Sequence, residues 1–202
     1  MRKGNTNRMN LIGDIHGKFA QYSKIIATLP ESIQLGDFGM GFIETPQWDQ
    51  KHKFIRGNHD NPKVCYDHPN FLGDYGITED GIFYVSGALS IDAVYRTPGV
   101  SWWPNEELSE RNYPAILELY EAAKPRIVIA HDAPFVKDYI LGGNAEDKKR
   151  FPNRTSDLLM PAMIKIHSPE IWVHGHYHCR SDWKIDKTRY IGLAELEVFS
   201  IE

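Results

Sequence analysis

The eight residues that decide the fold are Lys53-Phe54-Ile55-Arg56-Gly57-Asn58-His59-Asp60. Phe54 and Ile55 are typical of the end of a buried strand, and Gly57 interrupts the strand so that three polar side chains follow it. Such side chains are unfavourable in a core, because each would need its own buried partner. Open α/β sheets carry their chemistry at this end of a strand. By itself, however, the stretch is better explained as a polar turn.

Four other apolar segments end in the same way, and this repetition favours a functional site. Their polar residues are Asp14 and His16 after 9–13, Asp37 after 32–35, His131 after 126–130, and His176 and His178 after 171–173. Asp14 and His16 are two residues apart, so in an extended segment they project to the same side and can bind one ion together. Taken singly, Asp14 is equally explained as a helix N-cap and His16 as a histidine in a solvated turn.

The order of elements predicts an α/β fold of the α+β type, in which two sheets form a β-sandwich flanked by helices. Short apolar strands alternate with helices, which we expect after Gly17, over Glu106–Ala123 and from Thr155 onward. The helix from Thr155 is expected to bury Leu158, Leu159, Met163 and Ile166. The length of 202 residues suits a single domain, 1–202.

The remaining segments are expected to be strands and loops. Strands are predicted at Gly81–Val85, Ala88–Ile91, Trp183–Ile185, Tyr190–Leu193 and Leu196–Ile201, the last three being antiparallel. Thr97–Asn105 reads as a loop in which Trp102 and Trp103 either border the site or simply pack. Residues 135–153 form a long connection, either a mobile flap or a solvated charged segment.

The composition is that of a globular protein, with 42% hydrophobic and 25% charged residues. A formal net charge of -4 argues against a protein that holds nucleic acid by overall charge, although nucleic acid remains a candidate substrate. We expect no signal peptide, no membrane span, and no disulfide framework from Cys65 and Cys179. A cytoplasmic protein without a membrane partner is therefore predicted, and its oligomeric state is left open.

The polar residues at the strand ends have the chemistry of a metal site. They are Asp14, His16, Asp37, Asn58, His59, His131, His176 and His178. Carboxylate, amide and imidazole together suit manganese, iron, zinc or nickel better than magnesium or calcium, which prefer oxygen alone. Without cysteine in the set, a closed structural zinc site is disfavoured. Even without His59, the seven remaining ligands exceed what one ion takes, so we expect two divalent ions, preferably manganese, with Asp37 as the bridging carboxylate.

Five motifs in this order resemble those of the calcineurin-like metallophosphoesterase superfamily. They are Asp14-x-His16, Gly36-Asp37, Gly57-Asn58-His59-Asp60, His131 and Gly175-His176-x-His178. The resemblance implies that one metal ion is held by Asp14, His16 and His178, and the other by Asn58, His131 and His176, with Asp37 as the bridge. It also implies that His59 is the catalytic histidine, that Asp60 orients it, and that the fold is a β-sandwich flanked by helices.

The expected activity is hydrolysis of phosphate esters by a metal-activated hydroxide. His59 would donate a proton to the leaving oxygen or stabilise the charge at phosphorus. A small phosphodiester or nucleotide is the preferred substrate. The Ser/Thr protein phosphatase branch follows its second motif with Asp-Arg-Gly, whereas this chain continues with Phe38-Gly39-Met40-Gly41-Phe42.

Two alternatives therefore stay open beside the phosphodiesterase. The first is a Ser/Thr phosphoprotein phosphatase, and the second is a metal-binding interaction module without catalysis. The arginine that would bind phosphate is also left open, among Arg56, Arg96, Arg154 and Arg180.

Overall fold

Two β-sheets form the centre of the molecule in the computed structural model, which describes residues 8–134 and 154–202. The four-stranded sheet has the order β10-β1-β2-β3, with β10 at Val198–Ile201, β1 at Met9–Ile12, β2 at Ser32–Leu35 and β3 at His52–Ile55. The six-stranded sheet has the order β4-β5-β6-β7-β9-β8, with β4 at Tyr75–Ile77, β5 at Ile82–Val85, β6 at Ile127–Ala130, β7 at Ile171–His174, β9 at Thr188–Gly192 and β8 at Ser181–Ile185.

The inner strands of both sheets run parallel, which brings their carboxyl ends together. β1, β2 and β3 are parallel neighbours, and so are β5, β6, β7 and β9. Antiparallel strands occur at the edges, where β10 pairs with β1, β4 with β5, and β8 with β9. Loops that follow the parallel strands therefore emerge at one end of the sandwich.

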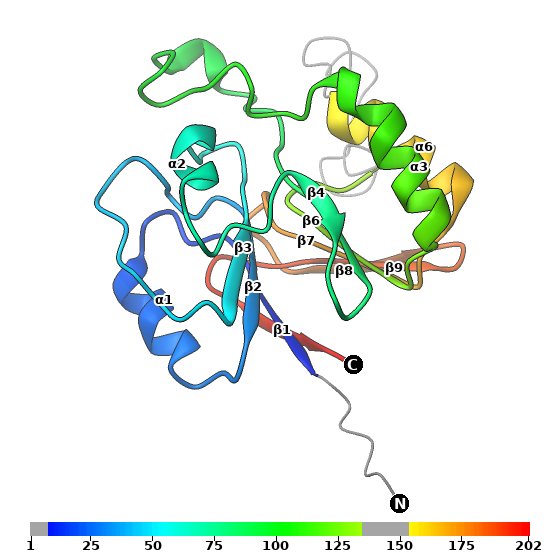
Figure 1. The fold of residues 1–202 in the computed structure, drawn as a ribbon, viewed down its shortest axis with the longest axis horizontal. Coiled ribbons are helices and arrows are strands. Elements are labelled where there is room, and N and C mark those ends of the chain that lie inside the picture. Colours follow the sequence, from blue (N-terminus) through cyan, green and yellow to red (C-terminus); the bar gives the residue numbers. More distant parts are fainter. Residues whose placement is uncertain (1–7, 135–153) are drawn as a thin grey trace, which may run out of the picture.

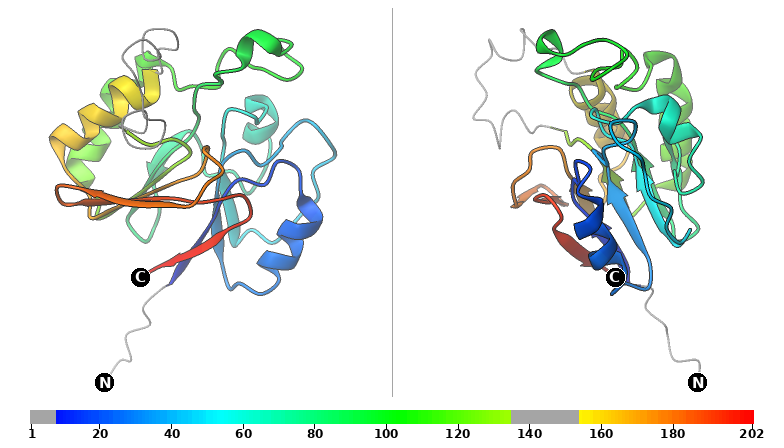
Figure 2. Two further views of the ribbon diagram at one scale, coloured as in Figure 1. Left: turned by 180° about the vertical axis from the view of Figure 1, so that it is seen from behind. Right: turned by 90° about the vertical axis from the view of Figure 1, so that its left-hand side faces the viewer.

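Alternating side chains of the strands create three apolar layers. Between the sheets, Leu11, Leu35 and Ile55 pack with Ile129 and Val173. Figures 1 and 2 show the two sheets with helices on their outer sides.

The helices cover the outer faces with their own apolar sides. On the four-stranded sheet, α1 (Phe19–Ile26) packs through Phe19, Tyr22 and Ile26, and α2 (Pro62–Tyr66) packs through Cys65. On the six-stranded sheet, α3 (Tyr113–Ala123) and α6 (Met160–Ile166) pack against a cluster that includes Trp172. The predicted sandwich of two sheets flanked by helices is confirmed.

The prediction of a strand at Ala88–Ile91 is wrong. This segment forms no strand in the structure, because the backbone N–H and hydroxyl of Ser90 are bound by the carboxylate of Glu106 and not by a neighbouring strand. The segment belongs to an excursion, residues 86–106, whose outer part extends away from the sheets (green in Figure 1) and contains a 3-10 turn at Ala93–Tyr95. Within it, Trp103 is buried.

Two helices also differ from their predicted form. α3 begins at Tyr113 and not at Glu106, because Ser109 caps a separate 3-10 turn at Glu110–Asn112 and Pro114 suits a first helical turn. α6 is preceded by a π-helical segment at Thr155–Leu159. The wider turn of the π-helical segment changes which side chains of the helix face the core. Leu159, Met160 and Met163 are therefore buried, whereas Leu158 and Ile166, which we predicted to be buried, are exposed.

Two further expectations concern segments beyond the sheets. The predicted flap or charged connection at 135–153 lies outside the described residues. Within residues 8–134 and 154–202, no helix has the length and apolar character to span a membrane.

Candidate metal centre

The predicted ligands lie on five loops, which follow β1, β2, β3, β6 and β7 and meet at one end of the sandwich. The loop after β1 carries Asp14 and His16, the loop after β2 carries Asp37, and the loop after β3 carries Asn58, His59 and Asp60. The loop after β6 carries His131, and the loop after β7 carries His176 and His178. Residues separated by more than 160 positions are thereby brought into contact.

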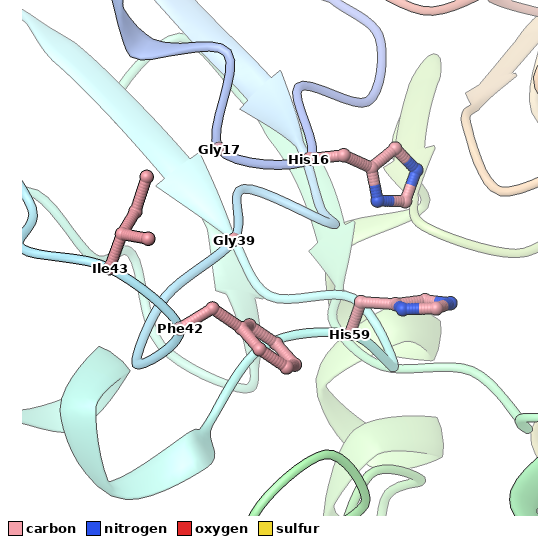
Figure 3. A pocket seen from close by; sticks show the side chains of 6 residues that line it. All are labelled: His16, Gly17, Gly39, Phe42, Ile43 and His59. Carbon is pink, nitrogen blue, oxygen red and sulfur yellow. The ribbon is translucent and has the colours of Figure 1, made fainter. Parts of the chain in front are cut away.

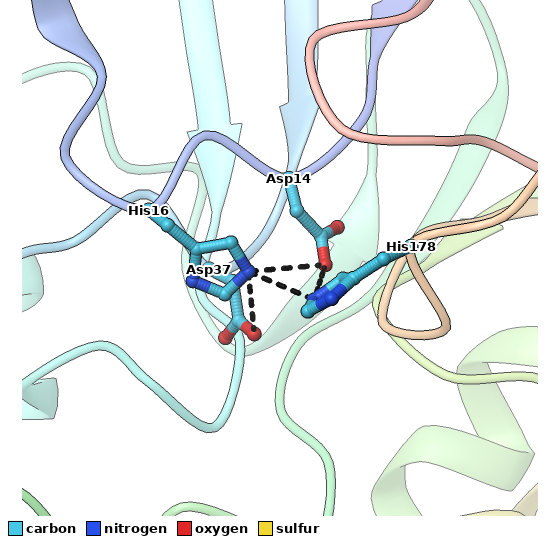
Figure 4. A group of neighbouring side chains, drawn as sticks. All are labelled: Asp14, His16, Asp37 and His178. Atoms are coloured by element: carbon cyan, nitrogen blue, oxygen red, sulfur yellow. Dashed lines mark hydrogen bonds and ion pairs between the residues drawn. The ribbon is translucent and has the colours of Figure 1, made fainter.

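The first ligand group consists of Asp14, His16, Asp37 and His178, whose ligand atoms all lie within 4.8 Å of one another. Nε2 of His178 is 3.1 Å from Oδ2 of Asp14 and 2.8 Å from Nε2 of His16. Nε2 of His16 is 3.9 Å from Oδ2 of Asp37. Figure 4 shows these four side chains converging from three loops. Both carboxylates are buried, while the two imidazoles reach the surface.

The second ligand group consists of Asp37, His131 and His176, and Asn58 adjoins it. Nε2 of His131 lies 3.3 Å from Oδ1 of Asp37 and 3.1 Å from Oδ1 of Asn58. The ring centroids of His131 and His176 are 4.9 Å apart. Asp37 belongs to both groups, so the arrangement has one carboxylate between two sets of donors.

The buried carboxylate of Asp37 makes this arrangement suitable for cations. Its Oδ1 accepts a hydrogen bond from the backbone N–H of His59, but its Oδ2 has no hydrogen-bond partner within the described residues. Although burial alone would raise the pKa of Asp37, the nearby imidazoles, above all that of His131, hold it well below its usual range. An ionised, buried oxygen without a donor is unfavourable unless a positive charge lies beside it. The donor set therefore fits divalent ions at both groups.

The neighbouring imidazoles respond to the same negative charge. Burial favours the neutral form of His131, but the carboxylate of Asp37 outweighs it and raises the pKa of His131 to about 10. A hydrogen bond with Asp14 raises the pKa of His178, whereas burial lowers the pKa of His176. The field of the two acidic residues thus attracts positive charge to the centre of the site.

Contacts behind the ligands fix the atoms that face the site. Nδ1 of His131 donates to the carbonyl of Leu35 at 2.7 Å, so Nε2 faces Asp37. Nδ2 of Asn58 donates to Oγ of Ser90 at 3.0 Å, and Ser90 in turn donates to Glu106 at 2.6 Å. This relay turns the oxygen of the Asn58 amide toward His131. The sequence did not reveal Ser90 or Glu106, because neither lies in a strand-end motif.

Glycines in the motifs leave room for ligands that come from other motifs. A Cβ added at Gly57 would lie 2.1 Å from Oδ1 of Asp37 and 2.6 Å from Nε2 of His131. A Cβ added at Gly175 would lie 2.1 Å from Oδ1 of Asp14. A side chain at either position would displace a ligand, so these glycines are needed for the close approach of the loops.

Asp60, which the sequence predicts to orient His59, contacts backbone groups of two loops. Its buried carboxylate accepts four hydrogen bonds, at 2.7–3.1 Å, from the backbone N–H groups of Phe38, Gly39, Met40 and Gly57. Burial, together with the nearby charge of Asp37, raises the pKa of Asp60. The residue ties the loop after β2 to the loop after β3, and so supports Asp37 and Asn58 indirectly.

His59 borders the ligand groups without belonging to either of them. Its Nε2 lies 4.0 Å from Oδ2 of Asp37, and it forms a hydrogen bond with the guanidinium of Arg96. Burial is the main cause that lowers the pKa of His59 to about 4, and Arg96 adds to it while Asp37 opposes it. At neutral pH the ring of His59 is therefore neutral in this structure, and its Nε2 accepts a hydrogen bond from the guanidinium of Arg96.

Arg96 is the one of the four candidate arginines that reaches this site. It is held by Asp92 at 2.8 Å, in the excursion between β5 and α3. The others are engaged elsewhere: Arg56 is buried against Asp74, Arg154 pairs with Glu107, and Arg180 pairs with Glu197. Asp92 is a further residue of the site that the sequence did not mark, because an acidic residue in a loop is usually just solvated.

A cavity of about 420 Å³ opens onto this constellation. Its lining combines ligands with residues of the excursion and comprises Asp37, Asn58, His59, Leu89, Ile91, Asp92, Arg96, His176, Tyr177 and His178. Tyr177 is fixed there by a hydrogen bond of 2.6 Å from its hydroxyl to Asp132. The cavity therefore brings the proposed ligands Asp37, Asn58, His176 and His178 together with the guanidinium of Arg96.

Comparison with known proteins bears on the fold and the family of the chain. In fold, the chain is similar to a solved structure described as "GAP50 the anchor in the inner membrane complex of Plasmodium", with a TM-score of 0.52, 10% identity, and coverage of 93% of this chain and 71% of that one. No curated protein sequence matches the chain. The profile of the calcineurin-like phosphoesterases matches residues 8–180, a span that contains every predicted ligand. The chain therefore belongs to the calcineurin-like phosphoesterase family.

Proposed function

We propose that the protein hydrolyses phosphate esters with two divalent metal ions. One ion would be held by Asp14, His16 and His178, the other by Asn58, His131 and His176, and Asp37 would bridge them. The observation that carries the proposal is the buried Oδ2 of Asp37, which belongs to both ligand groups and has no hydrogen-bond partner within the described residues. Two such ions supply an activated water and offset the charge that develops on the phosphoryl group. The mixture of imidazole, carboxylate and amide suits manganese, iron, zinc or nickel, and manganese is the ion that we propose.

Arg96 and His59 would bind and protonate the ester. The guanidinium of Arg96 lines the cavity beside the ligands and can donate to two phosphoryl oxygens at once. A phosphate anion beside His59 favours the protonated ring, so His59 would gain a proton as the ester binds. It could then donate this proton to the leaving oxygen.

The charge balance in the cavity favours a phosphodiester, including a nucleotide diester. A phosphate monoester carries nearly two negative charges at pH 7, because its second pKa is about 6, whereas a diester carries one. Asp92 lies 2.8 Å from Arg96 and lines the same cavity, so part of the positive charge of Arg96 is already neutralised. The second charge of a monoester would be repelled by this carboxylate.

The test is hydrolysis of bis-p-nitrophenyl phosphate and p-nitrophenyl phosphate by metal-stripped protein. Manganese, nickel, zinc and magnesium are restored in turn. We expect metal-dependent release with a clear preference for the diester, greatest with manganese. A preference for the monoester would contradict the diester assignment and favour the phosphoprotein phosphatase.

A non-catalytic interaction module is the second candidate function. Its support is the similarity in fold to the Plasmodium protein described as an anchor. Against it stands His59, which an interaction module would not need beside the ligands. Protein that binds two ions but releases no p-nitrophenol with any of the four metals would favour this alternative.

A further inference from the structure

A second hollow lies beside the metal-centre cavity and shares His59 with it. Its volume is about 210 Å³, and its lining consists of His16, Gly17, Gly39, Phe42, Ile43 and His59. Figure 3 shows how three loops form it: Phe42 and Ile43 come from the loop after β2, and the two imidazoles come from the loops after β1 and β3. The rings of His16 and His59 stand edge to face with centroids 5.2 Å apart. The hollow is therefore adjacent to the metal-centre cavity, and His59 lies between them.

The lining of this hollow differs from that of the metal-centre cavity. Its six residues include no Asp, Glu, Lys or Arg, and the two glycines contribute only backbone. The side chains of Phe42 and Ile43 are 45% and 55% exposed, so adjacent large apolar groups face solvent at the border of a polar site. The ring of Phe42 is held edge to face by the buried Trp103, at a centroid distance of 5.4 Å. The hollow therefore presents a positioned aromatic ring.

The size and the position of the hollow define what it would hold. An apolar cavity of about 150 Å³ accommodates a benzene ring, so about 210 Å³ is enough for one aromatic ring or nucleobase. In an in-line displacement, the leaving oxygen must lie next to the group that protonates it. His59 lines both the metal-centre cavity and the hollow, whereas Arg96 lines the cavity and not the hollow. With the phosphoryl group beside Arg96 and the leaving oxygen beside His59, the substituent on that oxygen can enter the hollow with Phe42.

We propose that the hollow formed by Phe42, Ile43 and the backbone of Gly17 and Gly39 binds the aromatic ring of the leaving group, an aryl group or a nucleobase. The proposal rests on the phosphoesterase function proposed above, because it places the ester between Arg96 and this hollow. Phe42 and Ile43 are then specificity-determining residues, and they take no part in holding the metal ions.

The test compares the binding of phenylphosphonate and methylphosphonate to manganese-loaded protein by calorimetry. We expect phenylphosphonate to bind about tenfold more tightly, because its ring stacks or packs against Phe42. Phe42→Ala and Ile43→Ala should each remove most of this advantage and leave methylphosphonate unaffected. Ile77→Ala is the matched control, since Ile77 is a similarly exposed isoleucine on β4 that does not line the hollow.

Three outcomes would overturn the proposal: no binding of phenylphosphonate, equal affinity for both phosphonates, or an advantage that survives in both variants. The result is independent of turnover. Protein that hydrolyses no ester but keeps a Phe42-dependent preference for the phenyl group would support the hollow and contradict the phosphoesterase function. Protein that hydrolyses esters without that preference would support the phosphoesterase function and contradict the proposal for the hollow.

Discussion

Four of the seven proposed metal ligands have a backbone conformation that is uncommon for residues with a side chain. The angle φ is 47° at His16, 53° at Asp37, 71° at His176 and 53° at His178. Each such residue costs about 1 to 3 kcal/mol, and the conformation persists only where the surrounding structure determines it. The hydrogen bonds of the flanking loops, including those that Asp60 accepts, provide this support. The ligands are thus held in place by the fold before any ion binds.

At the residue scale, substitution separates metal binding from turnover. Asp37→Ala removes the carboxylate shared by both ligand groups, so we expect loss of bound metal. His59→Ala removes a ring outside both groups, so the variant should keep both ions while the hydrolysis of bis-p-nitrophenyl phosphate slows by about 10² to 10⁴. Elemental analysis after gel filtration and steady-state kinetics measure the two effects. Equal metal loss in the two variants would refute this division of roles.

The sequence predicted which residues meet at the site but not all of their roles. The proposed ligands could be found because each follows an apolar strand, and parallel strands end at the same edge. The hydrogen-bond partners of Asp60 could not be predicted, because they are backbone N–H groups, which no sequence pattern marks. Arg96 could not be chosen from among four arginines, because its position depends on the path of the excursion from β5 to α3 and not on a local motif.

At the element scale, the excursion at residues 86–106 has a function that its apolar pattern concealed. The apolar residues in Ala88–Ile91 predicted a strand, yet Leu89 and Ile91 line the metal-centre cavity and Ser90 bonds to Glu106. The same excursion also supplies Asp92 and Arg96. Polar contacts between distant residues override local β-propensity in this segment, and sequence patterns do not reveal such contacts.

The buried relay from Asn58 through Ser90 to Glu106 should control the affinity of the second metal site. Both carboxylate oxygens of Glu106 accept hydrogen bonds from Ser90. Glu106→Gln replaces one acceptor with a donor, so Ser90 would present its proton to Asn58 and favour a flipped amide. We expect metal affinity at that site to fall about 10- to 100-fold, measured by manganese titration.

The matched control for this variant is Glu107→Gln. Glu107 is also buried, but its carboxylate accepts hydrogen bonds from Thr155, which does not contact Asn58. Its substitution should leave metal affinity unchanged. Equal loss of metal affinity in both variants would show that the effect comes from general destabilisation and not from the relay.

β3 contains a buried histidine that should make the stability of the fold depend on pH. His52 is bonded to Oγ of Ser32 on β2 at 2.9 Å, and burial is the main cause that lowers its pKa; Lys51 adds to this and Asp49 opposes it. The imidazole of His52 is therefore protonated more readily in the unfolded chain than in the folded one. The contribution of His52 to stability is complete above its unfolded pKa of about 6.5 and is lost as the pH falls below that value.

Urea unfolding of the metal-free protein at pH 7.5 and 5.5 tests this effect. His52→Asn cannot titrate in this range, so the variant should lose less free energy of unfolding between the two pH values than the unmodified protein. His131 contributes in the opposite direction, because its pKa is raised, but this contribution is common to both proteins. Identical losses in the two proteins would contradict the assignment to His52.

At the scale of the whole molecule, the fold was predictable because strands and helices alternate and the motifs occur in a fixed order. The pairing of the strands was less predictable than the fold class. β10 follows the hairpin of β8 and β9 in sequence, yet it pairs with β1 in the other sheet. The final strand thus returns the chain from the six-stranded to the four-stranded sheet. Such long-range pairing depends on which apolar faces meet, and a local pattern contains no information on it.

Because the ligand groups combine loops from both sheets, metal binding and global folding should be coupled. Asp14, His16 and Asp37 follow strands of the four-stranded sheet, whereas His131 and His178 follow strands of the six-stranded sheet. We propose that residues 1–202 form a single domain, so calorimetry should record one unfolding transition.

A ligand at 100 times its Kd adds about 2.7 kcal/mol per site to the free energy of unfolding, which corresponds to a rise in Tm of roughly 5–10 °C for a chain of this size. Asp37→Ala should keep the single transition and lose the rise on addition of manganese. Two separate transitions, or a rise that survives in Asp37→Ala, would contradict the view that one carboxylate joins the two sheets through the metal centre.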